Sequence, residues 1–106
     1  MVRQRLCRSD ALQDGAMQRF DGPNGLAIAL YRVEGRYYAT ADICSHGQSS
    51  LTDEGELDGY AIECGRHFGR FDIRTGAVLA SPCTRAIAAF AVIEDNGELF
   101  VELPDE

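Results

Sequence analysis

Two pairs of cysteine and histidine constrain this chain more than any other feature of its sequence. Cys44-x-His46 forms the first pair and Cys64-x-x-His67 the second, with residues 47–63 between them. The chain has only two histidines, and both stand in these pairs. Thiolates and imidazoles are ligands that proteins offer to transition metals. The fold is therefore expected to bring two separate loops together around one metal centre.

The order of the four candidate ligands narrows the kind of metal centre. A single zinc ion accepts two cysteines and two histidines, but zinc fingers usually place the two cysteines together and the two histidines together. Here each loop offers one of each, which suits a two-iron cluster with one iron held by cysteines and the other by histidines. A structural zinc module that binds another protein is the alternative.

The two pairs together resemble the Rieske [2Fe–2S] signature. The run from His67 to Gly76, His-Phe-Gly-Arg-Phe-Asp-Ile-Arg-Thr-Gly, is similar to the second cluster loop of small Rieske ferredoxins. Those ferredoxins serve multicomponent aromatic-ring-hydroxylating dioxygenases and are about as long as this chain. The resemblance implies one Rieske-type [2Fe–2S] cluster, with four ligands: Cys44, His46, Cys64 and His67.

Turn residues at regular intervals indicate an all-β fold. Strands are predicted at residues 4–7, 16–20, 26–33, 36–41, 55–57, 60–64, 71–73, 77–79, 87–94 and 98–103. Residues 26–33 are apolar on both alternating faces, which predicts a central strand buried on both sides. A helical turn is predicted at residues 9–12, with Ser9 or Asp10 as its cap. Hairpin turns are predicted at Glu34-Gly35, Asp58-Gly59, residues 74–76 and residues 95–97.

The resemblance adds an architecture to this pattern. It implies a Rieske fold, with antiparallel sheets in a small sandwich or barrel and a two-loop cluster-binding subdomain from roughly Ile43 to Pro82. At 106 residues, the chain is expected to form one domain, residues 1–106.

Charge and hydropathy exclude several classes of function. The net charge is −7 and all ten basic residues are arginine, so a nucleic-acid partner is not expected. No apolar run has membrane-spanning length and no signal peptide is visible, which predicts a cytoplasmic protein without a membrane partner. The acidic surface suits docking to basic patches on redox proteins. An acidic cluster between the two loops is interpreted as solvated surface, with a docking edge as the alternative: Asp53, Glu54, Glu56 and Asp58.

The remaining cysteines are not needed as ligands. Cys7 is interpreted as a core residue of the first strand, and Cys83 as an ordinary thiol, although it follows Pro82 in a loop that could approach the site. A secreted disulfide framework is a rival account of the four cysteines, but it has no need of the paired histidines. Arg66 and Arg70 flank His67, where they could balance the cluster's charge or touch a partner.

Comparison with other Rieske proteins predicts a low reduction potential. High-potential members carry an additional cysteine on each loop, and the matching positions here are Ser49 and Arg66. They also carry serine and tyrosine hydroxyls near the cluster, where this chain has Gly69 and Phe71. Without those donors the potential is expected at the low end of the Rieske range, about −150 mV.

Three glycines of the two loops have a predicted role. Gly47, Gly65 and Gly69 allow backbone N–H groups to approach cluster sulfurs. The alternative is that they are ordinary loop glycines.

The same residues argue against a catalytic role. A ring-hydroxylating oxygenase needs two further histidines and a carboxylate for its catalytic iron, and no histidine remains here. The predicted function is that of a ferredoxin, an electron carrier that takes single electrons from a flavin-dependent NAD(P)H reductase. It passes them to the Rieske centre of a terminal oxygenase in aromatic compound degradation. A monomer is expected. The alternative is a Rieske-like small subunit of a nitrite reductase or another oxidoreductase.

Overall fold

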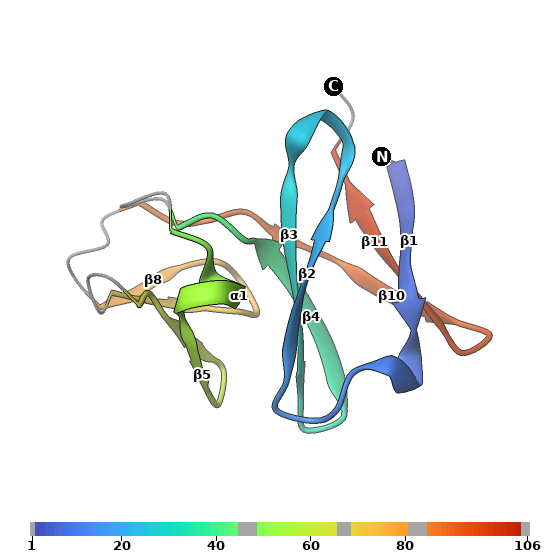
Figure 1. Ribbon diagram of the computed structural model, residues 1–106, viewed down its shortest axis with the longest axis horizontal. Helices are drawn as coiled ribbons and strands as arrows, with labels where there is room; N and C mark the ends of the chain where they lie inside the picture. The colour runs from blue at the N-terminus through green and yellow to red at the C-terminus, as the bar shows by residue number, and fades with distance from the viewer. Residues whose placement is uncertain (1, 45–48, 66–68, 81–84, 105–106) are drawn as a thin grey trace.

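The computed structural model describes residues 2–44, 49–65, 69–80 and 85–104, whose strands form three antiparallel sheets (Figure 1). The terminal sheet has the order β1 (Val2–Arg8), β11 (Glu98–Leu103) and β10 (Val92–Asp95). The central sheet has the order β2 (Met17–Asp21), β3 (Ala27–Val33), β4 (Arg36–Ala41) and β9 (Ala89–Phe90). The outer sheet has the order β5 (Glu56–Asp58), β6 (Ala61–Glu63), β7 (Arg70–Asp72) and β8 (Val78–Ala80). This confirms the all-β fold.

Strand β3 is buried on both faces, as its apolar pattern predicts. Ala29, Tyr31 and Val33 belong to a core cluster that also holds residues of the outer sheet. Ile28 and Leu30 belong to a second cluster with residues of the terminal sheet. Burying a large aliphatic side chain contributes about 1.5–3 kcal/mol, so one strand stabilises two cores at once.

The helical segments are single turns. The 3₁₀ turn η1 (Ser9–Ala11) confirms the helical turn predicted at residues 9–12. The 3₁₀ turn η2 (Pro23–Gly25) follows β2, and the sequence pattern did not predict helix α1 (Leu51–Glu54). The predicted cap of the first turn is wrong, because Arg8 occupies the N-cap position and no side chain caps the turn. None of the described helices has the length and apolar character that crossing a membrane requires.

Three of the four hairpin predictions are confirmed, including that of β7 and β8, whose strands pair on either side of residues 73–77. Glu34-Gly35 and Asn96-Gly97 have positive φ at both residues, as a two-residue turn between antiparallel strands favours. The turn between β5 and β6 is displaced by one residue, because Asp58 pairs with Ala61 and therefore belongs to the strand.

The predicted strand at residues 87–94 is wrong as a single element. Its first part, β9, pairs with β4 of the central sheet, and its second part, β10, pairs with β11 of the terminal sheet. The chain leaves one sheet and enters the other at Ala91, which lies between the two strands. Both halves have the same apolar β-forming character, so local pattern does not reveal the change of sheet.

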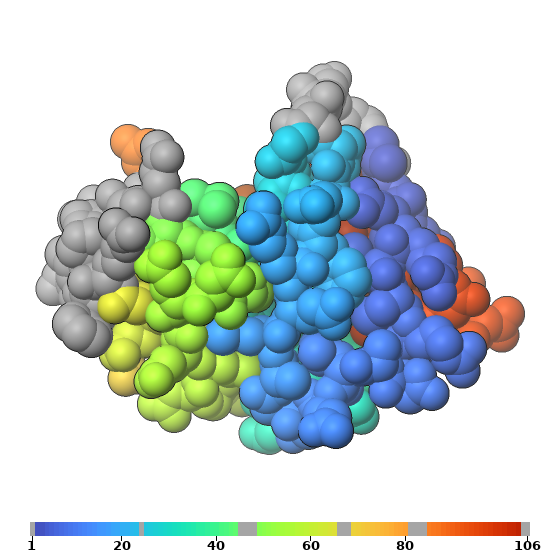
Figure 2. All heavy atoms as spheres, viewed as in Figure 1, coloured from blue at the N-terminus to red at the C-terminus, as the bar shows by residue number. Residues whose placement is uncertain are grey.

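The outer sheet lies beside the central sheet, on the side away from the terminal sheet (Figure 1). Helix α1 contacts β2, and Figure 2 shows the green residues of this region packed directly against the blue ones. Leu51 of α1 is buried in the same core cluster as Ile62 of β6 and Tyr31 of β3. Helix α1 and strand β6 are thus packed against the rest of the molecule.

Candidate metal centre

The structure brings the two candidate cysteine ligands into one buried cluster. Cys44 follows β4 and Cys64 follows β6, and they are 1% and 0% exposed. Both belong to the core cluster that includes Tyr31 and Phe71. Of the other predicted site residues and their neighbours, several lie outside the described residues: His46, Gly47, Arg66, His67, Pro82 and Cys83.

Equivalent backbone hydrogen bonds hold the two cysteines. The N–H of Cys44 donates to the carbonyl of Ser49 at 2.8 Å, and the N–H of Cys64 donates to the carbonyl of Gly69 at 2.7 Å. Each bond joins a cysteine to the residue five positions later and so closes the base of one loop. The backbone of both cysteines is therefore held in the same way at the base of its loop.

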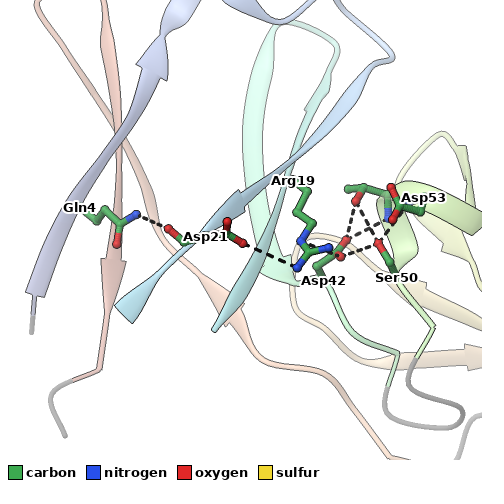
Figure 3. A network of polar contacts seen from close by, with 7 residues as sticks. Gln4, Arg19, Asp21, Asp42, Ser50 and Asp53 are labelled. Carbon is green, nitrogen blue, oxygen red and sulfur yellow. Dashed lines mark hydrogen bonds and ion pairs between the residues drawn. The ribbon is translucent and has the colours of Figure 1, made fainter. Parts of the chain in front are cut away.

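A buried carboxylate anchors the first loop to helix α1. Asp42 is fully buried, and it lies between Arg19 on one side and Ser50 on the other (Figure 3). Its Oδ2 accepts a hydrogen bond from the Ser50 hydroxyl at 2.6 Å, and its Oδ1 accepts from the N–H and the hydroxyl of Thr52 at 2.9 and 2.8 Å. Its backbone carbonyl accepts from the N–H of Leu51 at 2.7 Å.

We call these three side chains, Asp42, Ser50 and Thr52, the Asp42 clamp. Ser50 also pairs with Ile43 and accepts a hydrogen bond from the N–H of Asp53 as the N-cap of α1. The clamp therefore fixes both ends of the first loop, since Asp42 and Ser50 stand on either side of residues 43–49.

Helix α1 also meets the base of the second loop. A Cβ at Gly65 would lie 1.8 Å from the carbonyl oxygen of Glu54, so only glycine allows this approach of the two backbones. The first and second loops are thus connected through four residues of helix. The predicted approach of Gly65 to cluster sulfur stays a prediction, because this contact is with α1.

The residues around the cysteines fit a metal–sulfur centre. Ser49 is 5% exposed, and among the described residues its hydroxyl has no hydrogen-bond partner. Buried hydroxyls normally have a partner, so Ser49, whose carbonyl accepts from Cys44, offers a donor for an acceptor that none of the described residues supplies. Two buried thiols and one unpaired donor match a group that carries sulfur and negative charge.

Ion pairs cover the outer face of the outer sheet. Arg70 pairs with Glu63 at 3.2 Å and with Asp58 at 3.5 Å. Its predicted role toward a cluster or a partner stays a prediction. The four residues of the acidic cluster are all exposed, which fits solvated surface and a docking edge equally.

The turn after β7 contains a second group of charges. Arg74 donates hydrogen bonds to both carboxylate oxygens of Asp72 at 3.0 Å. These bonds hold the pKa of Asp72 below its ordinary value and raise that of Arg74. The guanidinium of Arg74 lies 4.3 Å from the centre of the Tyr60 ring. Burial, together with Glu34 and Tyr38, raises the pKa of Tyr60.

Of the three cysteines that the structure describes, Cys7 lies outside the candidate site. Cys7 in β1 is partly buried against the second core cluster, as its interpretation as a core residue predicts. Burial raises its pKa, although Arg5 acts in the opposite direction. This thiol is therefore a matched internal control for the two candidate ligands.

Sequence reasoning missed the Asp42 clamp. One signal was present, because Ser50 precedes Asp53 by three residues, a spacing typical of an N-cap and the third helical residue. Nothing in the sequence marks Asp42 as buried, since its three donors come from residues eight to ten positions later.

Comparison with known proteins adds independent findings. The family model described as "Rieske [2Fe-2S] domain" matches residues 2–91. The ferredoxin component of the p-cumate 2,3-dioxygenase system of Pseudomonas putida is 47% identical over 98 residues, which cover 92% of this chain and 83% of that protein.

Two solved structures share the fold over nearly the whole chain. A ferredoxin from Sphingomonas yanoikuyae B1 superposes with a TM-score of 0.89 at 37% identity, covering 97% of this chain and 100% of that one. A chain in the complex of reduced oxygenase and oxidized ferredoxin of carbazole 1,9a-dioxygenase gives a TM-score of 0.90 at 39% identity, covering 94% and 92%.

Proposed function

This chain belongs to the Rieske [2Fe–2S] domain family, and we propose that it carries single electrons to the Rieske centre of a terminal oxygenase. Its cofactor is one Rieske-type [2Fe–2S] cluster, and the chain is an electron carrier rather than an enzyme. The bound cluster supplies a one-electron redox couple. The chain's own residues hold it, exclude water and set its potential.

The proposed ligands are the four residues of the two pairs. Cys44 and Cys64 would hold one iron as thiolates, and His46 and His67 the other as neutral imidazoles, an arrangement that raises the potential above that of an all-cysteine site. The observation that carries this proposal is the burial of both cysteines in one core cluster, each with an equivalent backbone bond at the base of its loop. Residues 43–82 would then form the cluster-binding subdomain.

The proposed partners are a flavin-dependent NAD(P)H reductase that supplies electrons and a terminal oxygenase that accepts them during aromatic compound degradation. The relative in the carbazole 1,9a-dioxygenase complex was solved together with its oxygenase, which supports this partner. A net charge of −7 favours rapid, salt-sensitive encounter with basic surfaces. We expect a monomer in the cytoplasm.

Exchange of one ligand cysteine tests the proposal. The purified protein should be brown, bleach with dithionite and contain about two iron and two sulfide per chain. Cys44→Ser should lose the cluster and electron transfer to the oxygenase. Cys7→Ser, which removes a thiol outside the proposed site, should retain both.

Electron paramagnetic resonance of the reduced protein separates Rieske ligation from all-cysteine ligation. A colourless parent protein with one zinc per chain would contradict the proposal. So would Cys44→Ser protein that still delivers electrons at the parent rate.

A further inference from the structure

The hydroxyl of Ser49 is an exception among the buried and half-buried hydroxyls around the first loop. The Ser50 hydroxyl donates to Asp42 at 2.6 Å, and the Thr52 hydroxyl donates to the same carboxylate at 2.8 Å. The Thr40 hydroxyl is paired with Tyr31 at 2.9 Å. Ser49 is 5% exposed, and no described residue pairs with its Oγ. An unpaired hydroxyl in a low-dielectric site is costly, so an acceptor is expected.

The backbone holds Ser49 where it is. Its carbonyl accepts the hydrogen bond from Cys44 at 2.8 Å, and the next residue, Ser50, is fixed by its pairing with Ile43 and by its bond to Asp42. The backbone of Ser49 therefore cannot turn away without breaking the base of the loop. Ser49 and Cys44 are both buried, at 5% and 1% exposed, and this backbone hydrogen bond joins the two residues.

The chemistry of this region supplies the missing acceptor. We propose that the Ser49 hydroxyl donates a hydrogen bond to sulfur at the metal centre, either to the thiolate of Cys44 or to an inorganic sulfide of the cluster, and thereby raises the reduction potential. This inference rests on the proposed function. Reduction adds negative charge to the cluster, and a donor stabilises the reduced form more than the oxidised form.

The proposed donor differs from those of high-potential Rieske proteins. Ser49 stands where those proteins carry a bridging cysteine, whereas the positions of their hydroxyl donors are Gly69 and Phe71 here. A donor from the first loop would partly replace those missing from the second. It would place the potential above that of an otherwise identical chain with alanine at this position.

Removal of one hydroxyl tests the inference. Ser49→Ala should lower the equilibrium constant for one-electron reduction three- to tenfold, which corresponds to a potential about 28 to 59 mV lower. The readout is a redox titration followed by absorption, on protein with full iron and sulfide content. Ser49→Thr keeps a hydroxyl and should titrate within twofold of the parent.

A buried hydroxyl outside the two loops provides a matched control. Thr40→Val removes the hydroxyl that pairs with Tyr31 at 2.9 Å, so it should lower thermal stability and leave the potential within twofold. Resonance Raman spectra of Ser49→Ala should show higher iron–sulfur stretching frequencies. Shifts in modes sensitive to ³⁴S in the inorganic positions would assign the acceptor to sulfide, and shifts in the remaining modes to Cys44.

Two results would overturn the inference. One is a Ser49→Ala protein with an intact cluster whose equilibrium constant for one-electron reduction lies within threefold of the parent value. The other is an equal shift in Ser49→Thr, which would show that packing rather than the hydroxyl sets the potential. A parent protein without iron or sulfide would instead contradict the proposed function, so the two failures are distinguishable.

Discussion

At the scale of single residues, Asp42 is the side chain on which the first loop most depends. It is fully buried and accepts three side-chain or backbone hydrogen bonds from Ser50 and Thr52. Its ion pair with Arg19 is long, at 3.9 Å. The carboxylate is therefore held mainly by donors of the loop that it anchors, and its removal would leave those donors without an acceptor.

Asp42→Ala should lower the free energy of unfolding by about 3 kcal/mol or more, because each buried donor left unsatisfied costs about 1–3 kcal/mol. Urea unfolding followed by circular dichroism measures this change. Asp21→Ala is the control, since the Asp21 carboxylate is 87% exposed and pairs only with Arg19 among the contacts described. An equal decrease in the free energy of unfolding in the two variants would show that the Asp42 clamp contributes no more than an exposed ion pair.

At the scale of elements, the turn between β7 and β8 depends on one glycine. Gly76 has a φ of +81°, and a Cβ there would lie 1.9 Å from the carbonyl oxygen of Ile87. The N–H of Ile87 also donates to the carbonyl of Gly76 at 3.0 Å. This contact joins the outer sheet to the segment that leads into β9.

Gly76→Ala should therefore lower the free energy of unfolding by more than the strain of a left-handed residue, which is about 1–2 kcal/mol. Gly35→Ala is the matched control, because Gly35 has a φ of +76° but open space around its Cβ position. We expect a urea midpoint for Gly76→Ala well below that of Gly35→Ala. Coincident midpoints would show that the backbone at Ile87 moves away without cost.

The same turn predicts a dependence of stability on pH. The pKa of Asp72 is lower in the folded chain than its ordinary value of 3.8, mainly because Arg74 donates hydrogen bonds to it. The stabilisation is therefore fully present above pH 3.8 and is lost as the pH falls through the lower, folded pKa.

Asp72→Asn should thus lose less stability than the parent between about pH 5 and pH 2. Thermal unfolding midpoints across this range provide the measurement. Asp95→Asn, in an exposed hairpin, should follow the parent curve. A parallel fall in Asp72→Asn and parent would mean that the Arg74 contact does not contribute.

Local signals in the sequence predicted the elements better than the contacts between them. The alternation of residues 26–33 and the Glu34-Gly35 turn identify β3 and β4 because period and turn chemistry are local properties. The change of sheet at Ala91 has no local signal, because both sheets accept the same apolar strand. The two cysteines could be selected as a pair from their spacing, but the Asp42 clamp depends on tertiary contacts that spacing does not encode.

At the scale of the whole molecule, charge should control encounter with redox partners. With a net charge of −7, electron transfer from the reductase should slow as ionic strength rises from 50 to 500 mM, since screening shortens the Debye length from about 14 to 4 Å. Stopped-flow rates at several salt concentrations measure this dependence.

Variants separate the docking edge from solvated surface. Glu56→Gln should reduce the salt dependence if the acidic cluster forms the docking edge. Asp95→Asn, at the far end of the terminal sheet, should not. Equal slopes for all three proteins would identify the acidic cluster as solvated surface.

The position of strand β3 between the two cores affects how the protein unfolds. Because its two faces complete two different cores, neither core can open alone without exposing this strand. The backbone amides of β3 should therefore exchange with deuterium only through global unfolding, and more slowly than those of β5 or β8. Loss of the metal centre should then also speed amide exchange in the terminal sheet, far from the two cysteines.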